Sequence, residues 1–258
     1  MSNPFGPPIY FPDVTELCDS EGAELDLIGI GGKLDPDWLC DAYTHGLFPW
    51  PTGSYRHFRA EDYPRQARPG AWDMRLNRTV YDIMDPEEPM HWWSPNPRGI
   101  FEPGRFHVPQ RLKRTLSSGK FTVTFNQDFH NVMLACAIGP DRIGRTWITP
   151  ALFEAFLLLH RLGIAHSVET WHSGKLVGGA YGVAFHGLFA AESMFHRVTD
   201  ASKVALIRLL ERLTDNGFAL IDIQMLTEHT ERLGAIEIPR SEYMRRLHDA
   251  LRRDTVRF

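Results

Sequence analysis

Residues 166–224 carry a pattern of three strands, one helix and one further strand that few architectures accommodate. Three apolar runs interrupted by turn residues predict the first strands, at residues 166–171, 176–184 and 188–195. Residues 200–216 then repeat apolar positions at helical spacing, and residues 218–224 return to a strand pattern. Strands joined by tight turns form an antiparallel meander, whereas an intervening helix permits a crossover. We therefore predict an α+β fold with a mixed sheet and flanking helices.

The rest of the chain divides around this region. Four further helices and one strand are predicted: helices at residues 35–46, 109–118, 149–162 and 241–252, and a strand at 121–125. Residues 51–90 are rich in Arg, Asp, Pro and Tyr without a sustained period, so we interpret them as an insertion or long loop. We expect a small N-terminal α/β domain at residues 1–108, including this insertion, and a second domain at residues 109–258.

Composition limits the class of protein. The chain has 258 residues, and its net charge of −4 argues against a protein that coats nucleic acid non-specifically. No apolar run reaches the length needed to span a bilayer, and the first residues do not resemble a signal peptide. The three cysteines, Cys18, Cys40 and Cys136, lack paired or metal-ligand spacing. We expect a cytoplasmic protein that does not associate with membranes.

Polar residues in two of the predicted strands are candidates for chemistry. Asp222 and Gln224 point to one face of their strand and can polarise a reacting group, although any half-exposed strand shows the same alternation. Glu192 interrupts an otherwise apolar strand and shares a face with Met194. Because burying an unpaired carboxylate costs several kcal/mol, Glu192 lies either at the mouth of a cleft or in a structural ion pair.

Tryptophans and one basic run are candidates for contact with RNA. Trp50, Trp92, Trp93 and Trp147 can stack on bases, which contributes about 1–3 kcal/mol per base, or can simply pack in the core. Trp50 follows a turn and is, of the four, the strongest candidate for an exposed tryptophan. Arg111, Lys113 and Arg114 form either a solvated helix face or a contact with the end of one RNA.

Several familiar site motifs do not occur. The sequence has no HExxH motif, no cysteine pair suited to zinc, no P-loop and no G-x-S-x-G. We therefore expect neither a metal ion nor another cofactor.

Ten short motifs occur in the order found in the leucyl/phenylalanyl-tRNA–protein transferase family, which the chain resembles. They span most of residues 28–247 and lie at residues 31–34, 42–50, 92–98, 146–148, 165–169, 176–179, 192–195, 201–203, 220–224 and 233–235. One such motif is weakly specific, whereas ten in order are very specific.

The resemblance implies a second domain of the GNAT acetyltransferase type and an aminoacyl transfer reaction. Leucine or phenylalanine, with methionine as a further candidate, would pass from aminoacyl-tRNA to the N-terminal amine of a protein that begins with Arg or Lys. The new N-terminal residue would then mark that protein for degradation as an N-degron. The aminoacyl ester is already activated, so positioning and exclusion of water are the enzyme's main tasks. We expect a monomer without a cofactor.

The resemblance also implies roles for individual residues. As catalytic residues it indicates Glu192, facing the amine, and Asp222 and Gln224, at the ester. Asp222 either orients Gln224 or helps to deprotonate the amine. The platform for the terminal adenosine would comprise Tyr43, Trp50 and Trp147. The aminoacyl side-chain pocket would comprise Met194, Leu206, Leu209 and Leu213, although the leucine spacing equally suits a core. The acceptor stem would contact Arg111, Lys113 and Arg114.

Two alternatives remain open from the sequence. An acetyl-CoA-dependent N-acetyltransferase would share the fold, but the sequence lacks the [QR]-x-x-G-x-[GA] motif that holds pyrophosphate. A non-catalytic module that binds tRNA ends or protein N-termini would need Trp50 and Glu192 but not Asp222 and Gln224. The stretch at residues 51–90 is longer than the family pattern leads us to expect and lies next to Trp50 in sequence.

Overall fold

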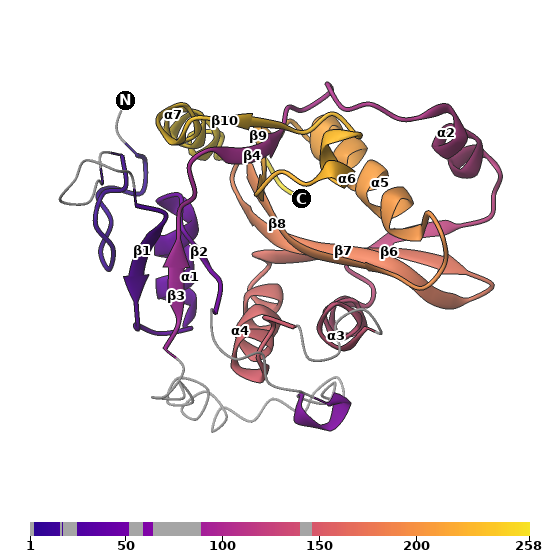
Figure 1. Ribbon diagram of the computed structural model, residues 1–258, viewed down its shortest axis with the longest axis horizontal. Coiled ribbons are helices and arrows are strands. Elements are labelled where there is room, and N and C mark those ends of the chain that lie inside the picture. Colours follow the sequence, from indigo (N-terminus) through magenta and orange to yellow (C-terminus); the bar gives the residue numbers. More distant parts are fainter. Residues whose placement is uncertain (1–2, 16, 18–24, 52–58, 64–88, 140–145) are drawn as a thin grey trace.

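The computed structural model describes residues 3–15, 17, 25–51, 59–63, 89–139 and 146–258. Within these residues the chain forms two sheets, one of three strands and one of seven (Figure 1). Most of the stretch at residues 51–90 lies outside the described residues, and within it η1 (Ala60–Asp62) is a short 3-10 helix. No described helix has both the length and the apolar character needed to cross a membrane.

The small sheet carries the N-terminal part of the site. Its strands are β1 (Leu27–Ile30), β3 (His91–Trp93) and β2 (Phe48–Pro49), antiparallel in that order. Helix α1 (Pro36–Thr44) begins where Asp35 accepts a hydrogen bond from the backbone N–H of Trp38, with proline in its first turn. Gly46 follows the helix with φ +82, and a Cβ there would lie 2.6 Å from the Met244 sulfur. Glycine adopts this φ without strain and therefore suits the turn, which leads into β2.

The seven-stranded sheet forms the larger unit. In spatial order its strands are β10 (Ile236–Ile238), β4 (Arg98–Phe101), β9 (Leu220–Gln224), β8 (Leu188–His196), β7 (Lys175–Phe185), β6 (Ala165–His172) and β5 (Thr122–Phe125). All neighbours are antiparallel except β8 and β9, which are parallel. Helix α5 (Ala201–Asp215) provides the connection between these two, so the predicted meander and helical crossover are confirmed.

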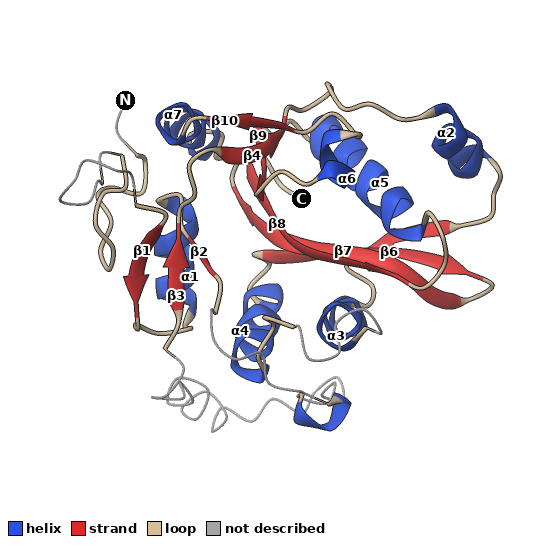
Figure 2. Cartoon of the chain, viewed as in Figure 1, coloured by secondary structure: helices blue, strands red, loops and turns tan. Residues whose placement is uncertain are grey.

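Helices cover both faces of the large sheet (Figure 2). On one face lie α3 (Phe129–Ile138) and α4 (Pro150–Arg161), which share a core with α1 and the small sheet. On the other lie α2 (Gln110–Ser117), α5 and the short α6 (Glu228–Glu231), and α7 (Arg240–Leu251) packs near the ends of β8 and β9. The mixed α+β architecture with flanking helices is as predicted.

Two differences from the sequence-based expectation concern β4 and α3. β4 precedes the boundary predicted at residue 108, yet it is an inner strand of the large sheet between β10 and β9. The strand was not predicted, because its four residues are too few to show a strand period. Helix α3 was not predicted, because it is apolar on most sides and most of its residues are buried.

Candidate active site

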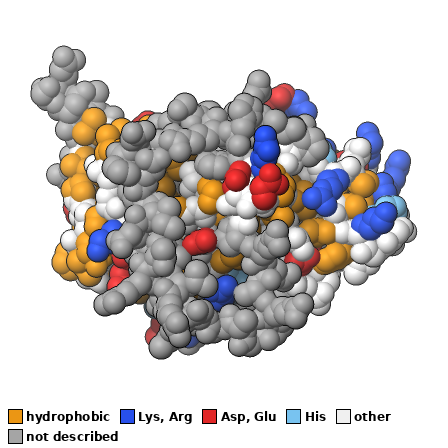
Figure 3. All heavy atoms as spheres, turned by 90° about the horizontal axis from the view of Figure 1, so that it is seen from below, with side chains coloured by type: hydrophobic (Ala, Val, Ile, Leu, Met, Phe, Trp, Pro, Cys, Tyr) orange, Lys and Arg blue, Asp and Glu red, His pale blue; other side chains and the backbone are white. Residues whose placement is uncertain are grey.

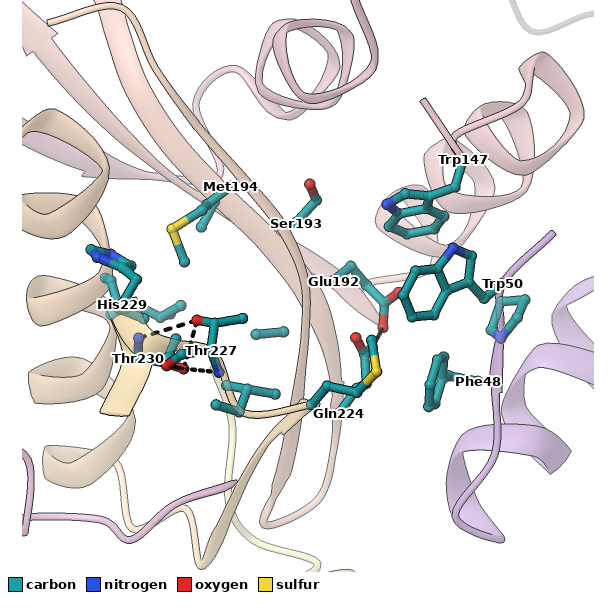
Figure 4. A pocket seen from close by; sticks show the side chains of 17 residues that line it. Phe48, Trp50, Trp147, Glu192, Ser193, Met194, Gln224, Thr227, His229 and Thr230 are labelled. Carbon is teal, nitrogen blue, oxygen red and sulfur yellow. Dashed lines mark hydrogen bonds between the residues drawn. The ribbon is translucent and has the colours of Figure 1, made fainter. Parts of the chain in front are cut away.

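A cavity of about 480 Å³ opens where β8 and β9 separate. The two strands pair only from Leu188 to Ala190, opposite Leu220 to Asp222, and β8 then continues to His196 paired only with β7. The cavity is lined from β2, β8, α5, the end of β9 and α6. It brings together seven of the predicted site residues: Trp50, Trp147, Glu192, Met194, Leu206, Leu209 and Gln224 (Figure 4).

Glu192 reaches the cavity because its strand is irregular there. Ala191 pairs with Gly182 and Ser193 pairs with Tyr181, which leaves Glu192 as the extra residue of a β-bulge. Glu192 is 8% exposed; Oε1 accepts a hydrogen bond from Gln224, and the Tyr43 hydroxyl lies beside the carboxyl, although Oε2 makes no hydrogen bond of regular geometry with a described residue. Burial raises the pKa of Glu192 to about 8, with the Asp222 charge adding to this effect and Tyr43, Arg98 and Gln224 partly offsetting it. A positively charged amine beside this carboxyl would favour its ionised form.

Gln224 ends β9 with its side chain directed at Glu192. Its Nε2 lies 3.0 Å from Glu192 Oε1, and its backbone N–H donates to Asp222 Oδ1 at 2.8 Å. The residue has φ +63, which non-glycine residues adopt rarely and which surrounding contacts must maintain. Gly99 of β4 gives the turn room, since a Cβ there would lie 2.8 Å from the Leu226 nitrogen. The carboxamide is thus held at a defined place in the cavity wall.

Asp222 lies behind Gln224, in the protein interior. Its carboxylate accepts hydrogen bonds from Arg98 Nε at 2.9 Å, from Arg98 Nη2 at 2.6 Å and from the Tyr243 hydroxyl at 2.8 Å. Asp222 and Arg98 are both 1% exposed. The structure therefore separates the predicted pair: Gln224 faces the cavity, and Asp222 supports it from the side of the core. Sequence reasoning missed Arg98 and Tyr243 as its partners.

Aromatic side chains form one end of the cavity. The rings of Trp50 and Trp147 lie 6.4 Å apart at 52°, beside Phe48. Trp93 donates a hydrogen bond from Nε1 to the Trp50 carbonyl and fixes its backbone. Tyr43, predicted as part of this platform, is instead buried against Phe185, because it lies on the inner face of α1. Its hydroxyl lies near enough to Glu192 for each group to influence the pKa of the other.

Apolar side chains and α6 form the other end. Met194, Leu206 and Leu209 line it, with His229 close to Met194 (Figure 4). Burial lowers the pKa of His229, so it is neutral near pH 7. Leu213 lies further along α5 and is fully buried in the core, which corrects its assignment to the pocket. Sequence reasoning did not identify His229, since nothing in the local pattern brings α6 to this cavity.

The basic residues of α2 lie away from the cavity. Arg111, Lys113 and Arg114 are exposed, whereas Leu112 is buried and attaches the helix to α5. α2 lies at the end of the molecule opposite the small sheet (Figure 1). Lys and Arg side chains gather at this same end in the view from below (Figure 3). The structure does not bring these residues to the cavity, although they share the α5 face of the sheet.

Within the part of the chain that the structure describes, no cluster of three or more His, Cys, Asp or Glu side chains is arranged to hold a metal ion. The residues at the cavity supply instead a buried carboxyl, a carboxamide, stacking surfaces and an apolar wall.

Solved structures that resemble the chain include two acetyltransferase-related proteins. A GCN5-related N-acetyltransferase from Kribbella flavida has a TM-score of 0.36 and 16% identity, over 57% of this chain and 55% of that one. A GCN5-related N-acetyltransferase-like protein from Streptococcus suis 89/1591 has a TM-score of 0.32 and 18% identity, over 54% of this chain and 57% of that one.

Sequence comparisons give a much stronger likeness. The profile of the family described as "Leucyl/phenylalanyl-tRNA protein transferase" matches residues 100–248. A leucyl/phenylalanyl-tRNA–protein transferase of Solidesulfovibrio magneticus is 43% identical over 225 residues, which cover 87% of this chain and 78% of that protein. One of Anaeromyxobacter dehalogenans is 40% identical over 249 residues, covering 96% and 90%. These sequence matches show that the chain belongs to the leucyl/phenylalanyl-tRNA–protein transferase family of aminoacyltransferases.

Proposed function

We propose that this protein transfers leucine, phenylalanine or methionine from aminoacyl-tRNA to the N-terminal α-amine of proteins that begin with Arg or Lys. The amine attacks the ester carbonyl, the new C–N bond forms, and the ester C–O bond breaks as the tRNA hydroxyl leaves with a proton. The single cavity that joins Trp50 and Trp147, Glu192 and Gln224, and Met194 supports this reaction best. An acyl ester needs no further activation, so holding the reactants together is the main contribution.

The aminoacyl-adenosine occupies the cavity from end to end. Its adenine stacks on Trp50 and Trp147, and its amino-acid side chain lies among Met194, Leu206 and Leu209. This orientation places the ester between the two ends, beside Gln224. A carboxamide nitrogen carries two hydrogens, and Glu192 uses one of them. We assign the second to the oxyanion that develops at the ester carbonyl.

Glu192 receives the acceptor amine. Its carboxyl is buried, and a bound ammonium can donate to Oε2, pass one proton to the carboxylate and then attack the ester as the neutral amine. The positive charge also favours ionisation of a carboxyl whose pKa is raised in the free protein. Asp222 acts as a positioning residue, because it holds the Gln224 N–H and is enclosed by Arg98 and Tyr243. Tyr43 supports Glu192 from behind.

The remaining parts of the proposal concern the tRNA acceptor stem and the role of the protein in the cell. The exposed residues Arg111, Lys113 and Arg114 on α2 contact phosphates of the acceptor stem. The protein acts as a cytoplasmic monomer, and the added residue marks the acceptor protein for degradation.

The deciding experiment is incubation with radiolabelled leucyl-tRNA and a peptide that begins with Arg. Label should appear in the peptide, and acetylation of the peptide's N-terminus should abolish transfer. Radiolabelled acetyl-CoA serves as the parallel donor. Transfer of the acetyl group, without transfer of leucine, would establish the N-acetyltransferase instead.

A further inference from the structure

We propose that Arg98 is a positioning residue shared by both ends of the cavity. One guanidinium group fixes Gln224 through Asp222, and the same group fixes the turn that carries Phe48 and Trp50. This inference rests on the proposed function and adds to it a physical link between the adenosine platform and the residue at the ester.

The link to the ester side runs through Asp222. Arg98 donates from Nε and Nη2 to the two carboxylate oxygens, and Asp222 Oδ1 also accepts from the Gln224 N–H. Because both charged groups are 1% exposed, neither can turn to solvent if the other is removed. A planar guanidinium holds a carboxylate in one orientation, and that orientation sets the backbone of Gln224.

The link to the platform runs through Gly46. Arg98 uses its remaining terminal nitrogen, Nη1, to donate to the Gly46 carbonyl at 3.1 Å. Its guanidinium carbon also lies 4.9 Å from the centre of the Phe48 ring. Gly46 begins the turn into β2, and both Phe48 and Trp50 line the aromatic end of the cavity. Displacement of this nitrogen would therefore move the platform.

Tyr243 contacts the same group without sharing this double role. Its ring lies 4.4 Å from the Arg98 guanidinium, and its hydroxyl donates to Asp222 Oδ2. Replacing Tyr243 by Phe keeps the ring beside Arg98 and removes the hydroxyl's bonds to Asp222 Oδ2 and from Arg98 Nη2. Because the bond from Arg98 Nη1 to the Gly46 carbonyl is kept, this variant acts mainly on the ester side, and an Arg98 variant can be compared with it.

The test is steady-state transfer of leucine from leucyl-tRNA by the full chain. Arg98→Lys keeps a charge beside Asp222 but cannot make all three directed bonds. We expect kcat to fall about tenfold and KM for leucyl-tRNA to rise about fivefold. Tyr243→Phe should lower kcat about threefold and leave KM for leucyl-tRNA within about twofold. The matched control is Arg246→Lys, which alters a partly exposed Arg paired with Glu102 and Glu242, and should change neither constant.

If Arg98 only stabilised the fold, its replacement would reduce the fraction of active enzyme, and kcat alone would fall. A fall in kcat alone, or no change in either constant, would overturn the inference. If Arg98→Lys does not fold, a double-mutant cycle of Phe48→Leu and Tyr243→Phe replaces it. Both rings contact the guanidinium, so a shared Arg98 predicts non-additive effects on kcat/KM of at least about threefold, and additive effects would overturn it. A wild-type chain that transfers no leucine contradicts the proposed function and this inference with it.

Discussion

Glu192 and Gln224 are joined by a hydrogen bond of 3.0 Å from the carboxamide to a carboxyl oxygen. The residue assigned to the amine and the residue assigned to the ester therefore hold each other, although β8 and β9 have already separated at this point. The arrangement leaves one oxygen of Glu192 and one hydrogen of Gln224 for the two reacting groups. Their separation is set before either substrate binds, as preorganised catalysis requires.

Gln224→Ala tests this division of roles. We expect kcat to fall about 10²-fold, because a donor to the oxyanion is removed, whereas binding of leucyl-tRNA should weaken less than about threefold. Single-turnover transfer and filter binding measure the two effects on the same preparation. Equal loss of both would favour the module that binds tRNA ends without catalysing transfer. Gln127→Ala, outside the cavity lining, serves as the matched control.

Glu192→Gln should change how stability depends on pH. Burial raises the pKa of the Glu192 carboxyl from 4.5 to about 8, so the folded chain retains a proton that the unfolded chain releases. The free energy of unfolding of the wild type therefore falls as pH rises through this range, and the Gln variant lacks this effect. In urea denaturation, the free energy of unfolding of the variant relative to that of the wild type should rise by on the order of 1–4 kcal/mol between pH 5 and pH 8. A difference that stays constant with pH would mean that Glu192 is not desolvated.

Much of the fold follows from local pattern. The meander of β6, β7 and β8 and the amphipathic α5 were predicted because their periods are long and turn residues bound them. Asp35 and Pro36 identified α1 because Asp35 accepts a hydrogen bond from an N–H of the first turn, where Pro36 needs no hydrogen-bond partner of its own. Such signals need only residues a few positions apart.

The missed parts of the site depend on distant contacts. Arg98 and Asp222 are 124 positions apart, and no local signal pairs them. Without this partner Asp222 could be placed on a strand face but not behind Gln224. Leu206, Leu209 and Leu213 lie on one face of α5, so their helical spacing does not distinguish them. Which of them reach the cavity depends on where β8 and β9 separate. Tyr43 shares the apolar face of α1 with Leu39 and Ala42, and because this face is buried Tyr43 does not line the cavity.

Tyr63 should influence the platform from the stretch at residues 51–90. Its buried hydroxyl donates to the Ile148 carbonyl at 2.8 Å, directly after Trp147, and its ring packs 5.1 Å from Phe153. Tyr63→Phe removes this bond at about 1 kcal/mol, so we expect KM for leucyl-tRNA to rise about fivefold with kcat nearly unchanged. Tyr10→Phe is the control, because Tyr10 stacks on Trp38 and is partly exposed. Similar effects from both variants would exclude a specific action on Trp147.

The basic helix α2 gives a prediction about salt. Replacing Arg111 and Lys113 by Ala should raise KM for leucyl-tRNA and make it less dependent on salt, by roughly one unit of logarithmic slope for each phosphate that the variant no longer neutralises. KM for leucyl-adenosine, which has no acceptor stem, should not change. Arg245→Ala on α7, an exposed Arg at the other end of the molecule, is the control. An increase in KM for leucyl-adenosine would show that α2 acts through the cavity instead.

Leu206 and Leu213 offer a matched test of the side-chain pocket. Both are buried on α5, but only Leu206 lines the cavity. Leu206→Val and Leu213→Val should each lower the free energy of unfolding by about 1–2 kcal/mol, because each removes a buried methylene. Only Leu206→Val should enlarge the space beside Met194 and raise the preference for phenylalanyl- over leucyl-tRNA, by about three- to tenfold in kcat/KM. Competition between the two labelled tRNAs measures this ratio independently of the active fraction. A shift of the same size in Leu213→Val would mean that the preference responds to the packing of the helix as a whole, and the pocket would have to be placed elsewhere.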